Sequence, residues 1–146
     1  MPRIPVLKLV EDVPPEEVEG MWLFNWISEQ EIQHPEFKWI AHIPNGGRRD
    51  VRTGAKLKAQ GVRTGIYDYL WLLPRGGFHG AVMELKKRKG GYLEDSQKNW
   101  RDWALQNGYC WQRCNGAEEA KAFFAWYFAL SPVPCPACEA LLVRAA

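Results

Sequence analysis

Two short apolar runs near the middle of the chain give the first structural prediction. They cover residues 66–73 and 78–86, and a Pro-Arg-Gly-Gly connection at 74–77 separates them. Short runs rich in aromatic and branched residues, joined by such a turn, are typical of an antiparallel hairpin. A turn centred on this connection sets Asp68 opposite Glu84, with Cβ atoms about 4.5–5.5 Å apart.

The remaining apolar periodicity predicts four helices and two more strands. The first helix opens with Pro14-Pro15 and ends before His34-Pro35, since proline suits a first turn and interrupts a helix interior. A strand over residues 37–43 would place Phe37 and Trp39 on one face and His42 on the other. The predicted order is helix (15–32), strand (37–43), helix (55–60), hairpin, helix (94–107), strand (109–114) and helix (117–130). This order favours a mixed α/β sheet with helices on its faces.

The chain has the size of one domain and enough apolar residues for a core, with 146 residues of which 47% are hydrophobic. We expect an N-terminal arm at 1–14, a folded domain at 15–130 and a tail at 131–146. No apolar run reaches the roughly twenty residues that a membrane helix requires, and no secretory signal opens the chain. These features predict a soluble, cytoplasmic protein with no membrane partner.

The net charge of +2 hides an asymmetry along the chain. Residues 1–36 hold eight acidic and two basic side chains, whereas residues 37–146 hold seventeen basic and nine acidic ones. Clustered cations of this kind indicate contact with phosphates, although a basic run can also be merely a solvated face. The candidate DNA-binding residues flank the hairpin: Arg48, Arg49, Arg52, Lys56, Lys58, Arg63, Lys87, Arg88 and Lys89.

The hairpin also carries the candidate chemistry. Two facing carboxylates among apolar strands are costly unless a cation lies between them. Lys86 shares a strand face with Glu84, so an Asp, a Glu and a Lys converge at one place. Such a set suits metal-assisted hydrolysis, in which an ion activates water and the lysine orients it or neutralises developing charge. A simple cross-strand salt bridge is the alternative.

Several blocks of the sequence together resemble a known nuclease family. They are Gly65-Ile66-Tyr67-Asp68, Glu84-Leu85-Lys86 and Gln97, with His42–Gly47, Lys58–Val62 and Pro74–Gly80. In this order they resemble the virus-type replication-repair nuclease (VRR-NUC) domain of the PD-(D/E)XK superfamily, over roughly residues 16–128. Tyr67 departs from the pattern, since the superfamily often has proline there. The resemblance implies a restriction-endonuclease-like fold and a phosphodiester hydrolase, in a bacterial or phage-infected cell.

The resemblance also implies roles and partners. Asp68 and Glu84 would bind Mg²⁺ or Mn²⁺, and Lys86 and Gln97 would align water and phosphate. Glu19 would be the acid that the first helix adds to the metal site, with Glu16 and Glu17 as alternatives; a solvated acid favoured by the helix dipole is the other interpretation. Stand-alone members resemble dimeric Holliday-junction resolvases, so we expect a homodimer acting on branched DNA in replication, repair or recombination. A catalytically weak DNA-binding module and a general-purpose nuclease are the alternative functions.

Other reactive or aromatic side chains are expected to be structural. Cys135 and Cys138 have the spacing of one half of a zinc site. The available second half, Cys110 and Cys114, would lie about 13 Å apart on a predicted strand, too far to share one ion. We therefore expect reduced thiols rather than structural zinc. His42 is expected to be structural rather than a ligand. Trp100 and Trp103 are expected to pack rather than to stack on bases.

Overall fold

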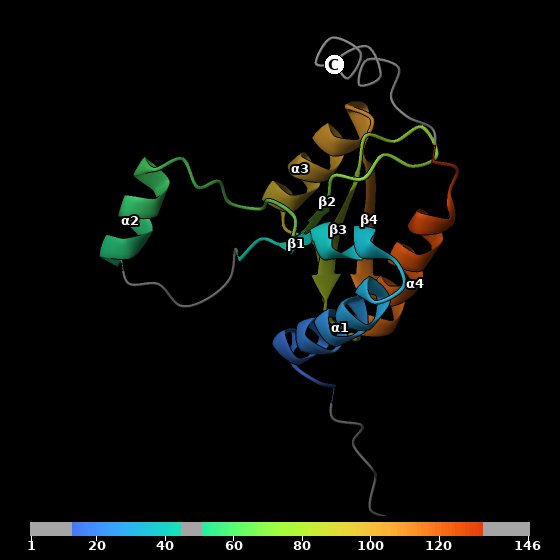
Figure 1. The fold of residues 1–146 in the computed structure, drawn as a ribbon. Coiled ribbons are helices and arrows are strands. Elements are labelled where there is room, and N and C mark those ends of the chain that lie inside the picture. The colour runs from blue at the N-terminus through green and yellow to red at the C-terminus, as the bar shows by residue number, and fades with distance from the viewer. Residues whose placement is uncertain (1–12, 45–50, 133–146) are drawn as a thin grey trace, which may run out of the picture.

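The computed structural model describes residues 13–44 and 51–132 of the chain (Figure 1). The elements are α1 (Glu16–Glu31), the 3-10 helix η1 (Pro35–Trp39), β1 (Ile40–His42), α2 (Val51–Ala59), β2 (Tyr69–Trp71), β3 (Ala81–Lys86), α3 (Asp95–Gln106), β4 (Cys110–Asn115) and α4 (Ala117–Ala129). The predicted order of α-helices and strands is confirmed. Nearly all of the expected arm and tail falls outside the described residues, as do Arg48 and Arg49.

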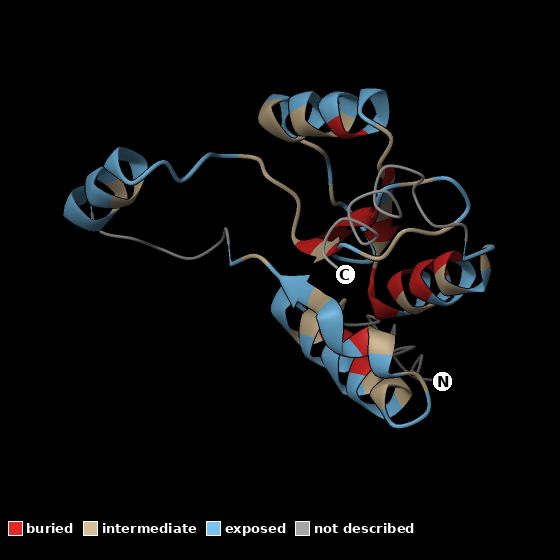
Figure 2. Ribbon diagram, turned by 45° about the horizontal axis from the view of Figure 1, so that its top comes forward, coloured by how far each residue is buried: buried red, intermediate tan, exposed pale blue. Residues whose placement is uncertain are grey.

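The four strands form one mixed sheet in the order β1-β2-β3-β4. The first two pairings are antiparallel, and β3 pairs with β4 in parallel. Every residue from Ala81 to Leu85 in β3 is buried, because helices cover both faces of this central strand. Helices α1 and α4 pack on one face and α3 lies on the other, with the buried residues gathered between them (Figures 1 and 2).

The predicted hairpin register is confirmed. Tyr69 pairs with Met83 and Leu70 with Val82, which places Asp68 directly across from Glu84. The Asp68 N–H continues the ladder by donating to the Met83 carbonyl at 3.1 Å. Side chains alternate along a strand, so Asp68 and Glu84 project from the same sheet face, the face covered by α3.

The hairpin strands are shorter than the apolar runs that predicted them. The His79 N–H donates to the Gly108 carbonyl and the Cys110 N–H donates to the Gly80 carbonyl, each at 2.9 Å. The chain leading into β3 therefore bonds to the segment before β4 rather than to β2. A Cβ on Gly80 would lie 2.6 Å from the Trp71 carbonyl oxygen, so only glycine fits this crossing point.

The prediction of a strand over residues 37–43 is wrong in its first half. Pro35 begins η1, since its fixed φ suits a helical first turn, and the strand covers only Ile40–His42. Phe37 is consequently buried in the core against Trp71, whereas Trp39 is 72% exposed. The two aromatic side chains do not share a face.

The cysteines of β4 belong to the core. Cys110 and Cys114 are buried and unpaired, and burial raises the pKa of their thiols to about 11 and about 12. They stay protonated at neutral pH and behave as small apolar side chains. Cys135 and Cys138 lie outside the described residues. Across residues 13–44 and 51–132, no helix combines the length and the apolar character needed to cross a bilayer.

Candidate active site

Three of the predicted residues meet where β2 begins and β3 ends. Glu84 is 2% exposed, and its Oε1 forms a salt bridge with Lys86 Nζ at 2.8 Å. The Asp68 carboxylate accepts the Leu85 N–H through Oδ2 at 2.9 Å. The structure therefore brings together Asp68, Glu84 and Lys86, which the sequence placed on facing strands.

Burial raises the pKa of both carboxyl groups. Burial is the main reason that the pKa of Glu84 rises to about 7, and the nearby charge of Asp68 raises it further, although Lys86 opposes the shift. Burial also raises the pKa of Asp68, while the Leu85 amide and Lys86 act in the other direction. Because the pKa of Glu84 is about 7, the metal-free pair does not carry two full charges at neutral pH.

Gln97 is held against Glu84 by its own helix start. Its Nε2 donates to Glu84 Oε1, and its Oε1 accepts the Glu94 N–H at 3.0 Å. Glu94 is the N-cap of α3, and the two residues form a capping box. The box fixes the amide with its donor end toward the acid, so Gln97 orients Glu84 in this structure.

Glu16, one of the acids suggested on the first helix, interacts with the site. Its pKa is raised, first because its carboxyl is partly removed from water and also because Asp68 is close, while Lys86 opposes the shift. A hydrogen bond to the Lys87 backbone links it to the end of β3. The residue as a whole remains exposed, so this carboxyl borders the site from the solvent side.

The structure directs Glu19 to different partners. This residue is 0% exposed; its Oε2 accepts the Ala117 N–H at 2.7 Å and its Oε1 lies 2.6 Å from Arg88 Nε. Arg88 also lies over the Trp22 ring, 5.3 Å from its centroid. Glu19 thus joins α1, the start of α4 and the loop after β3. This placement favours Glu16 over Glu19 as the first-helix acid of the site.

His42 is a neighbour of the site that the sequence interpretation undervalued. Its charge acts on Asp68 and lowers that carboxyl's pKa, and its ring lies 5.0 Å from the Tyr69 ring. The pairing of His42 with Tyr69, one residue beyond Asp68, explains the proximity. The sequence predicted a strand over residues 37–43 that contains His42, but the strand with which it pairs could not be identified from its own sequence.

The predicted DNA-binding cations fall into two groups. Arg52, Lys56 and Lys58 are exposed on α2, which stands away from the rest of the domain (Figure 1) and has no buried residue. Lys87 and Lys89 are exposed on the loop after β3, whereas Arg88 is engaged by Glu19. Arg63 is exposed on the segment that leads from α2 to the site.

The donors at the site suit a hard divalent cation. Carboxylate oxygens are the ligands that Mg²⁺ and Mn²⁺ prefer, and two carboxyl groups face each other here. In the described part of the chain, His, Cys, Asp and Glu side chains do not gather in threes as a ready-made metal cluster. A cation would therefore complete its coordination with water or main-chain oxygen, as Mg²⁺ commonly does.

Comparison with solved structures agrees with this arrangement. The chain superposes on a structure described as a VRR_NUC domain protein with a TM-score of 0.71 and 27% sequence identity, over 81% of this chain and 91% of that one. No protein-family model matches the chain, and no curated protein matches it. The fold is thus the α/β fold of a VRR_NUC structure, and the similarity indicates a nuclease.

Proposed function

We propose that this chain is a divalent-metal-dependent DNA endonuclease that hydrolyses phosphodiester bonds. The observation that carries the proposal is the convergence of Asp68, Glu84 and Lys86 at one sheet end, with the Glu84 pKa raised to about 7. A purely structural salt bridge needs one acid for one lysine. Here a second acid lies beside the first, as a cation site requires.

The roles of the residues follow from their contacts. Asp68 and Glu84 would hold Mg²⁺ or Mn²⁺, with Glu16 at the solvent side of the site. When bound, the ion would lower the pKa of a water and offset charge developing on the phosphate. Lys86 presents ammonium donors beside Glu84 and would orient the water or the scissile phosphate. Gln97 would keep Glu84 in place through its capping box.

The substrate is proposed to be DNA because exposed cations precede and follow the acidic pair along the chain. Arg52, Lys56, Lys58 and Arg63 precede it along the chain, and Lys87 and Lys89 follow it. All six are exposed in the structure. These cations would attract the phosphates of a DNA backbone to this part of the molecule.

Branched DNA and a homodimer are the finer part of the proposal. A twofold dimer would hold two active sites at a fixed separation, which suits paired nicks in a four-way junction. The surface offers apolar side chains for an interface, since Met21 is 59% exposed, Phe24 60% and Trp126 51%. Phe123 and Phe124 are buried in the monomer and would not contribute.

Cleavage assays on purified protein test the activity. Asp68→Asn and Glu84→Gln should each abolish cutting of duplex, flap and four-way DNA in Mg²⁺ while DNA binding survives. Asp102→Asn, an exposed acid on α3, is the matched control and should cut as the wild type does. If the Asp68→Asn, Glu84→Gln double variant still cuts, the site assignment is wrong. If the wild type binds DNA but never cuts it with either metal, the chain is a DNA-binding module.

A further inference from the structure

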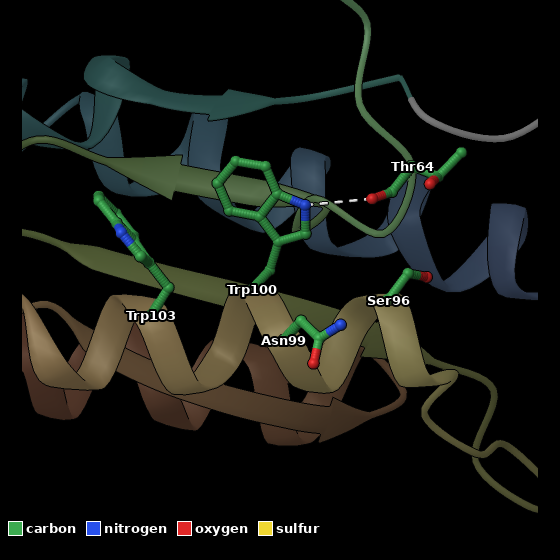
Figure 3. Close-up of a pocket in the computed structure, with 5 residues that line it drawn as sticks. All are labelled: Thr64, Ser96, Asn99, Trp100 and Trp103. Atoms are coloured by element: carbon green, nitrogen blue, oxygen red, sulfur yellow. Dashed lines mark hydrogen bonds between the residues drawn. The ribbon is translucent and has the colours of Figure 1, made fainter.

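A second feature of α3 lies beside the proposed active site. Figure 3 shows an open apolar pocket of about 560 Å³ lined by Thr64, Ser96, Asn99, Trp100 and Trp103. Four of these residues occur at positions 96, 99, 100 and 103, the spacing of one helix face. The volume lies within the range of about 300–1,000 Å³ that small-molecule sites occupy.

The pocket has a fixed wall. Trp100 Nε1 donates to the Thr64 carbonyl at 3.1 Å, which holds the indole against the segment leading to Asp68 (Figure 3). Gly65 has φ +78°, and a Cβ there would lie 2.5 Å from Ser96. The segment and the helix are therefore in direct contact, and the pocket does not depend on a loose side chain.

Trp103 provides the other wall and remains open to solvent. One side of its ring system packs near Tyr109, at 6.5 Å between centroids with a 24° interplanar angle, and Trp100 approaches edge-on at 6.2 Å. Trp103 is nevertheless 52% exposed, so the ring is incompletely covered by the protein. A half-exposed tryptophan is costly to leave in water, because a large apolar surface stays unburied.

The polar groups around these rings suit a nucleobase. Asn99 is exposed and offers both an amide donor and a carbonyl acceptor, and the hydroxyls of Thr64 and Ser96 can do either. Together they provide flat apolar walls with a few polar groups at the edge, the combination on which unpaired bases stack and hydrogen-bond.

Charge and continuity identify the nucleobase as part of a DNA strand. Arg63 immediately precedes Thr64, and residues 51–66 contain four cations and no acid. Gln97, which contacts Glu84, directly follows Ser96 on the same helix. A strand whose phosphate reaches the acids would therefore have a neighbouring base within reach of the pocket.

We infer that the pocket of Thr64, Ser96, Asn99, Trp100 and Trp103 binds one unpaired nucleobase of the DNA substrate. The inference rests on the proposed nuclease function and adds a selectivity to it. DNA with an extrahelical or single-stranded base beside the scissile phosphate gains a stacking contact that fully paired duplex cannot make. This inference departs from the sequence-based expectation that Trp103 packs rather than stacks on bases.

Binding measurements without cleavage test this site separately from catalysis. Fluorescence anisotropy in EDTA compares a fully paired duplex with the same duplex carrying one unpaired thymidine. Trp103→Ala should weaken binding of the unpaired substrate by roughly ten- to a hundredfold and leave the paired duplex unchanged. Trp103→Phe, which keeps a flat ring, should retain most of the wild-type affinity for the unpaired substrate.

The control is Trp39→Ala, which removes a tryptophan that is 72% exposed from η1, outside the pocket. It should bind both DNAs as the wild type does, and thermal melting should show all variants folded. A 5-iododeoxyuridine at the unpaired position should cross-link to Trp103 or Trp100. If Trp103→Ala loses equal affinity for paired and unpaired DNA, or loses none, the inference that the pocket binds a base is wrong.

The two proposals fail in different ways. Selective binding of the unpaired base without any cleavage would contradict the proposed nuclease activity and support the base-binding pocket. If a Trp103→Ala variant cleaves DNA and binds unpaired DNA as tightly as the wild type, the nuclease proposal is supported and the base-binding pocket is contradicted.

Discussion

At the scale of single residues, the site is defined by carboxyl groups that share too little positive charge. Glu84 is almost fully buried and has one lysine for a partner, while Asp68 faces it across the hairpin. Metal-free protein must then either keep a proton on the pair or hold two close negative charges. Stability, metal affinity and pH are consequently linked at this point.

The first prediction concerns pH. The folded pKa of Glu84, about 7, exceeds the ordinary value of 4.5, so the folded state binds more protons than the unfolded state between these values. Stability of the metal-free protein should therefore be highest below pH 4.5, as far as this group is concerned, and fall as pH rises to about 7. The loss should be roughly 2–3 kcal/mol.

Urea unfolding at pH 5 and pH 8 in EDTA measures this slope. Glu84→Gln should remove most of it, and Mg²⁺ should recover stability of the wild type at pH 8 but not of the variant. A wild-type stability that rises between these pH values, with Glu84→Gln showing the same trend, would contradict the assignment.

The second prediction separates the two acids of α1. Glu19→Gln should lower the free energy of unfolding by about 1–2 kcal/mol, because Arg88 loses a charged partner while the Ala117 amide keeps an acceptor. Glu16→Gln should leave stability within about 0.5 kcal/mol, as exposed positions usually do, and reduce Mg²⁺-dependent cutting at least tenfold. Equilibrium unfolding and initial cleavage rates on one substrate provide both readouts.

The opposite pattern would restore Glu19 to the metal site. In that case Glu19→Gln would abolish cutting at unchanged stability, and Glu16→Gln would cut normally.

At the scale of elements, α2 is the least typical part of the fold. Its nine residues include no buried side chain, and it stands apart from the sheet (Figure 1). An isolated helix this short gains little stability of its own in water. Its three cations, Arg52, Lys56 and Lys58, are instead placed where a DNA backbone could pack against them.

The third prediction therefore concerns salt. Changing Arg52, Lys56 and Lys58 together to glutamine should flatten the dependence of log affinity on log salt by up to about three units, because fewer counterions leave DNA on binding. Changing Lys87 and Lys89 should flatten it by up to about two units. Lys121→Gln, a cation paired with Glu118 on α4, is the control and should leave the slope unchanged.

Titrations of one duplex at several salt concentrations give these slopes. An unchanged slope for the triple variant would mean that α2 is a solvated helix without a DNA contact. A loss of affinity at unchanged slope would instead indicate unfolding of α2.

At the scale of the whole molecule, the aromatic core and the candidate site lie on opposite faces of one sheet. The face covered by α1 and α4 holds the aromatic core, including Trp71, Phe124 and Tyr127. The face covered by α3 holds Asp68, Glu84 and the Gln97 contact. The candidate catalytic groups thus lie on strands of the sheet without interrupting the core.

The fourth prediction concerns assembly. Sedimentation at micromolar concentration should show a homodimer, and Phe24→Glu should convert it to a monomer by placing a charge in the apolar interface. The monomer should still nick duplex DNA but lose paired, symmetric nicks in four-way junctions. Leu105→Glu, a change on α3 at a side chain 52% exposed, is the control and should remain dimeric.

A wild-type monomer that cuts linear duplex and junctions equally would contradict this prediction. It would leave a general-purpose DNA nuclease with the same active site.

The sequence by itself determined the local pattern and the facing pair. The apolar runs and the Pro-Gly connection specified the hairpin, and the period of two along a strand then set Asp68 opposite Glu84. Caps and prolines located the helices, because their backbone requirements are local. Lys86 followed from the same strand period.

Only the tertiary structure decided which helix residues reach the site. Acids at 16, 17 and 19 look alike in sequence, but packing of α1 against Tyr69 and α4 turns Glu19 to Arg88 and leaves Glu16 beside Lys86. Phe37 and Trp39 likewise separated because Pro35 started a 3-10 turn. Contacts between segments distant in sequence depend on how whole elements pack, and no local period records that choice.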